Sequence, residues 1–273
     1  MKSFRAFIEA KLRDSHIPSI PHVISFREKH EKNSVKEDRS TPIVTGRTHQ
    51  SWLAEPANKH LVPSSSADSS SLASREHPEH VSNKLSETNK FNPKEKKAIA
   101  AYTGHHDGDP DDDISDEQGD WHSYKINHAL INNKPIPRHL KATEAGLESA
   151  VRSNPIQHRV HVFSGVSFNP LDHVDNKGRM RSPAYISASH DKYTATQYSQ
   201  PTAQDRNASH IIQFHLKPGD PATHVEKESL KPGEYETVIG KGAILKHIKT
   251  ETYRSGPGEH PHVYHVHHFS IER

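Results

Sequence analysis

The sequence PGEYETVI, residues 232–239, places two carboxylates two residues apart directly before a β-rich run. Alternate side chains of a β-strand point to the same face, so Glu234 and Glu236 are predicted to face the same space. Two like charges this close repel each other unless they face water or a cationic ligand. The pair beside a glycine turn therefore indicates a site for a positively charged substrate or transition state.

Composition limits the size of the folded core and the classes of function. Only 31% of the 273 residues are hydrophobic, which is too few for the whole chain to form one well-packed core. The formal net charge is +2, from 36 basic and 34 acidic residues, so no dedicated nucleic-acid or membrane surface is expected. The chain has no cysteine, which excludes disulfides, thiolate metal sites and cysteine nucleophiles.

The distribution of apolar residues divides the chain into three parts. Residues 1–26 begin with MKSFRAFIEAKLR, whose apolar side chains lie at helical spacing and predict a short amphipathic segment. Residues 27–91 are dominated by Ser, Pro, His, Lys and Glu, which predicts a disordered linker. Residues 92–273 carry helix signals first and strand signals afterwards, which predicts one α+β domain.

Within the third part, local signals define the order of the elements. Asn92 and Pro93 predict a helix start, as N-cap and first helical residue before KEKKAIAAYTG. SYKINHALINN and ATEAGLESAVRS predict two further helices. After Pro155, β-rich stretches separated by Pro and Gly turns predict strands, with one short helix at HDKYTATQYS.

Four of these pieces, in this order, resemble the R-S-E class of ADP-ribosyltransferases, which includes bacterial toxins and tailed-phage enzymes. They are the helical pair KKAIAAYTG and SYKINHALINN, the strand HVFSGVSF, the S-x-S strand and helix PAYISASHDKYTATQYS, and the E-x-E loop KESLKPGEYETVIGKGAILK. The resemblance covers about residues 92–250. It implies a helical lobe followed by two packed antiparallel β-sheets, with NAD as substrate and no required metal.

The resemblance also assigns catalytic roles to three residues. Glu236 matches the catalytic glutamate, which would hold the nicotinamide-ribose 2′-hydroxyl and stabilise an oxocarbenium-like centre as nicotinamide leaves. Glu234 matches the residue that orients an acceptor arginine, whose guanidinium a carboxylate can bind in a bidentate way. Ser187 matches the first serine of the S-x-S motif, which hydrogen-bonds the catalytic glutamate. Tyr235, between the two glutamates, is expected to point to the opposite face.

Contacts with NAD are expected, by the same resemblance, from Ser164, Gly165, Ser189 and Tyr198. One position departs from the family pattern. The family has an arginine before the glycine of the first strand, whereas this chain has Ser164, which brings no charge to a phosphate. Arg179 and Arg181, in the turn before PAYISAS, are alternative cations for this site.

The 25 histidines are the compositional outlier. Four of them lie in HVYHVHH, residues 262–268, where His265 and His267 would share a strand face. Paired histidines can bind zinc or nickel, but a site needs a third or fourth ligand that strand placement alone does not supply. Surface or interstrand histidines are therefore expected here, and a metal site is the alternative.

Together, the motifs predict an NAD-dependent protein ADP-ribosyltransferase that modifies arginine. The first residues, MKSFRAFIEA, resemble the N-terminal sequences of large tailed-phage proteins. The expected partners are therefore host bacterial proteins with accessible arginine, and the expected location is the host cytoplasm after packaging in a virion. Two alternatives remain: a binding module that kept this fold and lost NAD turnover, with Ser164 as its sign, and a histidine-rich, metal- or pH-responsive virion protein.

Overall fold

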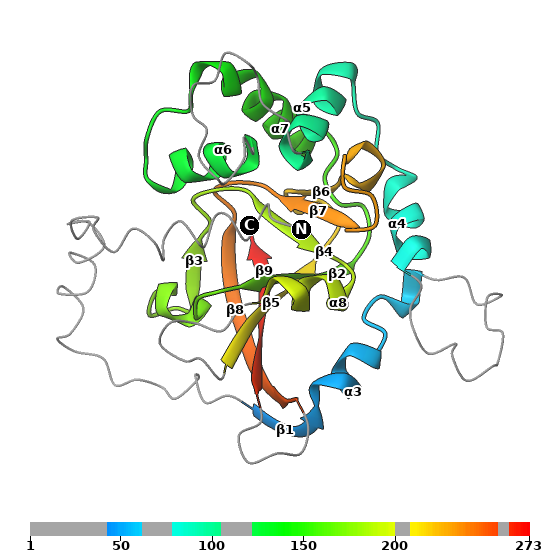
Figure 1. Ribbon diagram of the computed structural model, residues 1–273, viewed down its shortest axis with the longest axis vertical. Coiled ribbons are helices and arrows are strands. Elements are labelled where there is room, and N and C mark those ends of the chain that lie inside the picture. Colours follow the sequence, from blue (N-terminus) through cyan, green and yellow to red (C-terminus); the bar gives the residue numbers. More distant parts are fainter. Residues whose placement is uncertain (1–42, 62–77, 105–121, 200–207, 256–261) are drawn as a thin grey trace.

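The computed structural model describes residues 43–61, 78–104, 122–199, 208–255 and 262–273 (Figure 1). The strands are β1 (Ile43–Thr48), β2 (Val160–Val166), β3 (Arg179–Arg181), β4 (Ile186–Ser189), β5 (Ala208–Leu216), β6 (Ala222–His224), β7 (Glu236–Ile239), β8 (Ile244–Arg254) and β9 (Val263–Glu272). The α-helices are α3 (His49–Ala54), α4 (Pro78–Ser86), α5 (Pro93–Thr103), α6 (His122–Ile131), α7 (Lys141–Ser153) and α8 (Lys192–Tyr198). The short 3₁₀ helices are η1 (Lys59–Leu61), η3 (Arg138–Leu140), η4 (Pro170–His173) and η5 (Glu226–Glu228).

The described strands form one hydrogen-bonded sheet in the order β1-β8-β9-β5-β2-β4-β7-β6, with β3 paired to β8. The predicted α+β class with an N-terminal helical lobe is confirmed. The sheet differs in detail from two separate antiparallel sheets. Its two halves are joined where β2 meets β4 at the single pair Phe163 and Ser189, and two strand pairs are parallel, β1 with β8 and β5 with β9. β9 pairs antiparallel with β8 along one edge and lies with its other edge beside β5, which runs in the same direction as β9.

The helical lobe consists of α5, α6 and α7, which gather at one end of the molecule beside β6 and β7 (Figure 1). α5 begins where the sequence predicts. The Asn92 side chain accepts hydrogen bonds from the backbone of Lys94 and Glu95, and the Glu95 side chain accepts from the backbone of Asn92. Gly146 lets α7 approach α5 closely, because a Cβ at this position would lie 2.5 Å from the Cβ of Ala98.

A buried polar contact fixes the lobe to the sheet just ahead of β4. Asn127 of α6 donates a hydrogen bond to the carbonyl of Tyr185 (3.2 Å) and accepts one from the amide of Tyr185 (3.2 Å). Its amide group also donates to the hydroxyl of Tyr102 in α5 (3.0 Å). The segment that enters the S-x-S strand is therefore held by both of the first two helices of the lobe.

Residues 43–61 and 78–91 do not behave as the expected linker, although they are polar overall. β1 pairs with the edge of β8, and Trp52 of α3 is buried against Phe163 of β2. α4 buries Val81 and Leu85 in the main core. A few apolar side chains are enough to order these segments, because they pack against a sheet that the rest of the chain forms. The amphipathic segment within residues 1–26 lies outside the described residues, and the division into domains stays a prediction.

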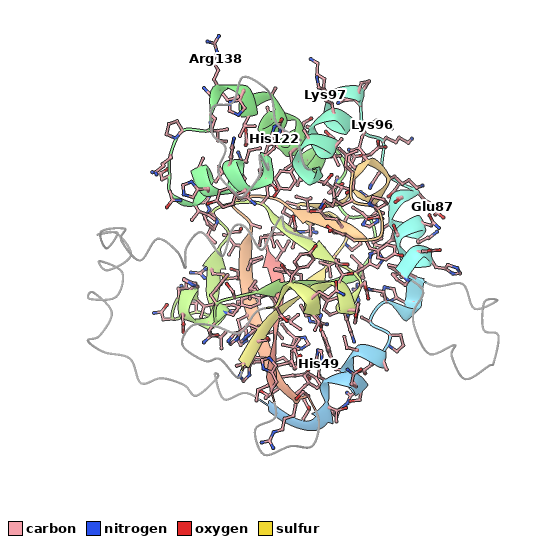
Figure 2. The ribbon with its side chains drawn as sticks, in the orientation of Figure 1. His49, Glu87, Lys96, Lys97, His122 and Arg138 are labelled. Carbon is pink, nitrogen blue, oxygen red and sulfur yellow. The ribbon has the colours of Figure 1, made fainter. Side chains whose placement is uncertain are left out.

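α3 lies at the end of the molecule opposite the helical lobe, where Figure 2 labels His49. The ring of His49 stacks on Tyr264 of β9, with 3.6 Å between the ring centroids. α3 also contacts α8, because Lys192 at the start of α8 donates hydrogen bonds to the carbonyls of Trp52 and Glu55. Within the part of the chain that the structure describes, no helix has the length and apolar character needed to cross a membrane.

The histidines of the last strand form interstrand pairs, as the sequence analysis expected. His267 hydrogen-bonds His210 of β5 with 2.9 Å between ring nitrogens. On the other face, His268 lies between His215 (2.9 Å) and the carboxylate of Glu251 (3.0 Å). Over the described ranges, no group of three or more His, Asp or Glu side chains is placed to hold a metal ion.

Burial makes several of these histidines hard to protonate. It lowers the pKa of His267 to about 2, and the neighbouring histidines add to this effect. Burial also lowers the pKa of His190 and of His268 to about 4. The folded protein therefore keeps these rings neutral at pH values where the unfolded chain would charge them.

We expect the free energy of unfolding to fall as the pH falls from 6.5 towards 4. In this window the unfolded chain takes up protons on its exposed histidines and the folded chain does not, so each buried histidine contributes about 1.4 kcal/mol per pH unit. His267→Gln should reduce the slope by the amount of one histidine, measured by urea denaturation at several pH values. His139→Gln, at an exposed position, should leave the slope unchanged, and equal slopes in all three proteins would contradict the prediction.

Candidate functional site

A cleft opens between β2, β4, α8 and the turn that precedes β7. These elements come from four separate parts of the sequence. The cleft is lined, among others, by all seven predicted site residues: Ser164, Gly165, Ser187, Ser189, Tyr198, Glu234 and Glu236. The structure therefore brings together in one cleft all the residues predicted for catalysis and for contact with NAD.

Glu236 is the first residue of β7, where it lies in register with Ser189 of β4. Its side chain is buried, with 7% exposure. Burial raises the pKa of its carboxyl to about 7, and the negative charges of Glu234 and Glu226 act in the same direction. A hydrogen bond from Ser187 favours the charged form and limits the rise. At neutral pH the group therefore exchanges readily between its acid and its carboxylate.

Glu234 reaches the cleft by a different route from the predicted one. β7 begins at Glu236, so Glu234 belongs to the preceding turn and strand alternation does not place it. The turn depends on Gly233 and Tyr235, whose φ angles of 87° and 53° are left-handed. Glu234 accepts a hydrogen bond from the hydroxyl of Tyr198, with 2.8 Å between the oxygens. The two carboxylates thus meet because of a tight turn.

Tyr235 does not line the cleft. Its ring lies against His190, with 5.2 Å between the ring centroids. His190 in turn donates a hydrogen bond from its Nε2 to the carbonyl oxygen of Pro78, the first residue of α4, with 2.7 Å between the two atoms. The expectation that Tyr235 points away from the two glutamates agrees with this placement.

Ser164 serves a structural purpose in place of the expected cation. Its hydroxyl donates a hydrogen bond to the carbonyl of Ser187 (3.0 Å), which ties β2 to β4 close to their single paired position. The neighbouring Gly165 lets α8 lie directly on β2, because a Cβ there would come within 2.2 Å of the carbonyl of Ala195. Both residues therefore shape the wall of the cleft.

The alternative cations of the sequence analysis do not replace the arginine. Arg179 and Arg181 lie on β3, which pairs with β8, and neither lines the cleft. Arg179 forms ion pairs with Asp175 and Glu272. Among the described residues that line the cleft there is no Lys, Arg or His. The cation whose charge acts on the Glu236 carboxyl is Lys231, in the loop before the E-x-E turn.

Comparison with known proteins identifies the family. The model of the ADP-ribosyltransferase exoenzymes matches residues 116–258, just over half of the chain. The chain belongs to the ADP-ribosyltransferase exoenzyme family. ADP-ribosyltransferases use NAD as a substrate, and the family requires no metal. A search of curated proteins gives no significant match.

Solved structures of ADP-ribosyltransferases have the same fold as this enzyme. The C3 exoenzyme of Clostridium limosum is 14% identical, with a TM-score of 0.50 over 72% of this chain and 93% of that one. C3stau2 of S. aureus, solved with NAD, is 15% identical, with a TM-score of 0.50 over 72% and 94%. Vis of Vibrio splendidus, solved with agmatine, is 14% identical, with a TM-score of 0.50 over 72% and 83%.

Two features of this candidate site escaped the sequence analysis. The first is the hydrogen-bonding role of Tyr102, which is buried in α5 and bonds both Asn127 and Ser187. The sequence analysis included Tyr102 and Asn127 only as residues of KKAIAAYTG and SYKINHALINN, the two helices that resemble the family pattern. The second is Glu226, which binds the backbone of the E-x-E turn. It is one acidic residue in a charged stretch, so no local signal distinguishes it.

We expect Ser187→Ala to raise the pKa of Glu236 above its wild-type value of about 7. The substitution removes a hydrogen-bond donor to the charged form, and such a bond shifts a carboxyl by about one pKa unit. An NMR titration of the ¹³C-labelled glutamate side chains measures the change without requiring activity. Ser189→Ala is the matched control, because the Ser189 hydroxyl accepts from the backbone amide of Asp191. A value for Ser187→Ala at or below that of the wild type would contradict the assigned bond.

Proposed function

We propose that this enzyme transfers ADP-ribose from NAD to arginine side chains of target proteins. The observation that carries the proposal is the pair of unlike carboxylates in one cleft. Glu236 is buried and Glu234 is partly exposed. One carboxyl is therefore placed for the ribose inside the cleft, and the other is accessible to an acceptor arriving from outside.

Glu236 supports the cleavage step. As the bond between ribose C1′ and the nicotinamide nitrogen breaks, nicotinamide leaves with the bonding electrons and positive charge develops on the ribose. A carboxylate beside that centre attracts the transition state more strongly than the ground state, and the attraction is large because water is excluded. The same carboxylate can accept a hydrogen bond from the ribose 2′-hydroxyl.

Glu234 supports the transfer step. A guanidinium nitrogen of the acceptor attacks C1′, forms the new C–N bond and loses a proton, which the Glu234 carboxylate, the more exposed of the two cleft glutamates, can accept. The hydroxyl of Tyr198 donates to one oxygen of Glu234 and holds it in place, while the other oxygen is available to the acceptor. Vis, a structural neighbour, was solved with agmatine, which carries the same guanidinium group as arginine.

The proposed acceptors are proteins of a bacterial host, with the host cytoplasm as the place of action. This part of the proposal rests on the resemblance of residues 1–10 to phage proteins, and those residues lie outside the described part of the chain. Incubation with labelled NAD and a bacterial lysate would identify the acceptors by transfer of the label. Absence of labelled bacterial proteins, combined with labelling of agmatine, would reject the host proteins and keep the reaction.

A second candidate is a binding module that has lost NAD turnover. The observation that favours it is Ser164, because the hydroxyl at the arginine position is already used by the carbonyl of Ser187. The wild-type protein distinguishes the two candidates. Neither transfer to agmatine nor release of nicotinamide at millimolar NAD would favour the binding module, and either product would exclude it.

We expect substitution of the two glutamates to have different effects on agmatine labelling and on NAD hydrolysis. Glu236→Gln should lower both agmatine labelling and NAD hydrolysis by a factor of about 100 or more, since it removes the charge that stabilises the transition state. Glu234→Gln should lower agmatine labelling to a similar degree but retain NAD hydrolysis, because water needs no guanidinium-binding carboxylate. Glu87→Gln is the control, since Glu87 is exposed and pairs with Lys84 of α4 away from the cleft. Equal loss of both reactions in Glu234→Gln would contradict its acceptor role.

A further inference from the structure

Glu226 makes two hydrogen bonds with the turn that carries the cleft glutamates. One carboxylate oxygen accepts from the backbone N–H of Gly233 at 2.6 Å. The other oxygen accepts from the backbone N–H of Glu236 at 3.2 Å. The two amides flank Glu234 and Tyr235, so one side chain spans the whole E-x-E segment.

The position of Glu226 is itself fixed by the fold. It is the first residue of η5, directly after Val225, whose amide donates to the carbonyl of Glu236 (2.9 Å). Glu228, at the end of η5, pairs with Lys96 of α5 (2.8 Å), which Figure 2 shows on the outer side of the helical lobe. The side chain that holds the turn therefore projects from a short helix anchored both to β7 and to the lobe.

The turn needs such an anchor because its backbone is unfavourable. Tyr235 has a φ angle of 53°, a left-handed conformation that costs a non-glycine residue on the order of 1 kcal/mol or more. Residues 232–235 have no partner strand, since β7 begins only at Glu236. Two hydrogen bonds to one charged group are stronger than bonds to neutral acceptors and hold the chain in this conformation.

We propose that Glu226 is a positioning residue for the transfer reaction, which clamps the E-x-E turn so that both cleft glutamates keep their places. Glu226 does not line the cleft and does not touch the reacting atoms. The inference rests on the proposed roles of Glu234 and Glu236. It adds that their geometry depends on a third carboxylate behind the turn.

The charge of Glu226 has a second effect. It raises the pKa of Glu236, in the same direction as burial and Glu234, whereas Lys231 lowers it. The other titratable groups that face Glu236 are the hydroxyls of Tyr102 and Tyr198. In a variant that stays folded, removal of the negative charge at 226 should therefore move the midpoint of the Glu236 titration to lower pH.

The test compares Glu226→Ala, Glu226→Gln and the control Glu87→Gln with the wild type; Glu87 is exposed and pairs with Lys84 of α4, away from the cleft. Amide hydrogen exchange measured by NMR should become about tenfold faster at Gly233 and Glu236 in Glu226→Ala, and less so in Glu226→Gln, which keeps one acceptor oxygen. In agmatine labelling, kcat should fall about tenfold while KM for NAD changes less than threefold, since Glu226 is outside the cleft. In Glu226→Gln the Glu236 midpoint should fall, and Glu87→Gln should match the wild type in every measurement.

Unchanged exchange at both amides in a folded Glu226→Ala protein would overturn the clamp. Faster amide exchange with an unchanged kcat would show that Glu226 holds the turn but is not a positioning residue for the reaction. If the wild type labels no agmatine and hydrolyses no NAD, the proposed function fails instead, while amide exchange and the NMR titration of Glu236 still decide whether Glu226 holds the turn. If the alanine variant does not fold, the same measurements are made on Glu226→Gln, whose side chain has nearly the same shape as glutamate.

Discussion

The structure depends on one buried carboxyl, that of Glu236, and on the hydrogen bonds that make its burial tolerable. Which group donates and which accepts in these bonds is determined by Asn127, the residue of the series that lies farthest from Glu236. Asn127 accepts from the amide of Tyr185 with its oxygen, so its nitrogen must donate to the hydroxyl of Tyr102. Tyr102 can then donate to Ser187, and Ser187 to Glu236. A helix-to-sheet contact and a site contact are therefore parts of one chain of hydrogen bonds.

This chain links the position of the lobe to the state of the site. α5 and α6 contribute Tyr102 and Asn127, and β4 contributes Ser187. A buried carboxylate with no donor would be forced into its neutral form. With the donor in place, burial raises the pKa of Glu236 only to about 7. The helical lobe thus acts on the chemistry without providing a residue that lines the cleft.

The sequence predicted the site better than the outer parts of the fold. All seven motif residues meet in one cleft, because short motifs at strand ends and turns determine where their own side chains point. Residues 43–61 were predicted as linker because their apolar side chains are few, yet Trp52 needs only the existing surface around Phe163 to become buried. Such docking depends on a surface formed by distant residues, which no local pattern contains.

The same limit explains the turn and the histidines. The i, i+2 pattern suggested a shared strand face for the two glutamates, but the left-handed residues and the partner at position 226 come from the tertiary structure. For His267, the alternation of the strand gave the face, while its partner His210 depended on β9 inserting beside β5. Periodicity predicts the direction of a side chain, and topology decides what that side chain meets.

Burial raises the pKa of Glu236, and no cation among the described residues that line the cleft opposes this rise. An arginine in the cleft would stabilise the carboxylate and lower its pKa. In its place Ser164 holds β2 to β4, and the described cleft residues supply no cation to balance the two glutamates. The oxidised nicotinamide ring of NAD carries a positive charge, and its arrival would favour the ionised form of Glu236. Binding of this positively charged ring and ionisation of Glu236 would therefore be coupled.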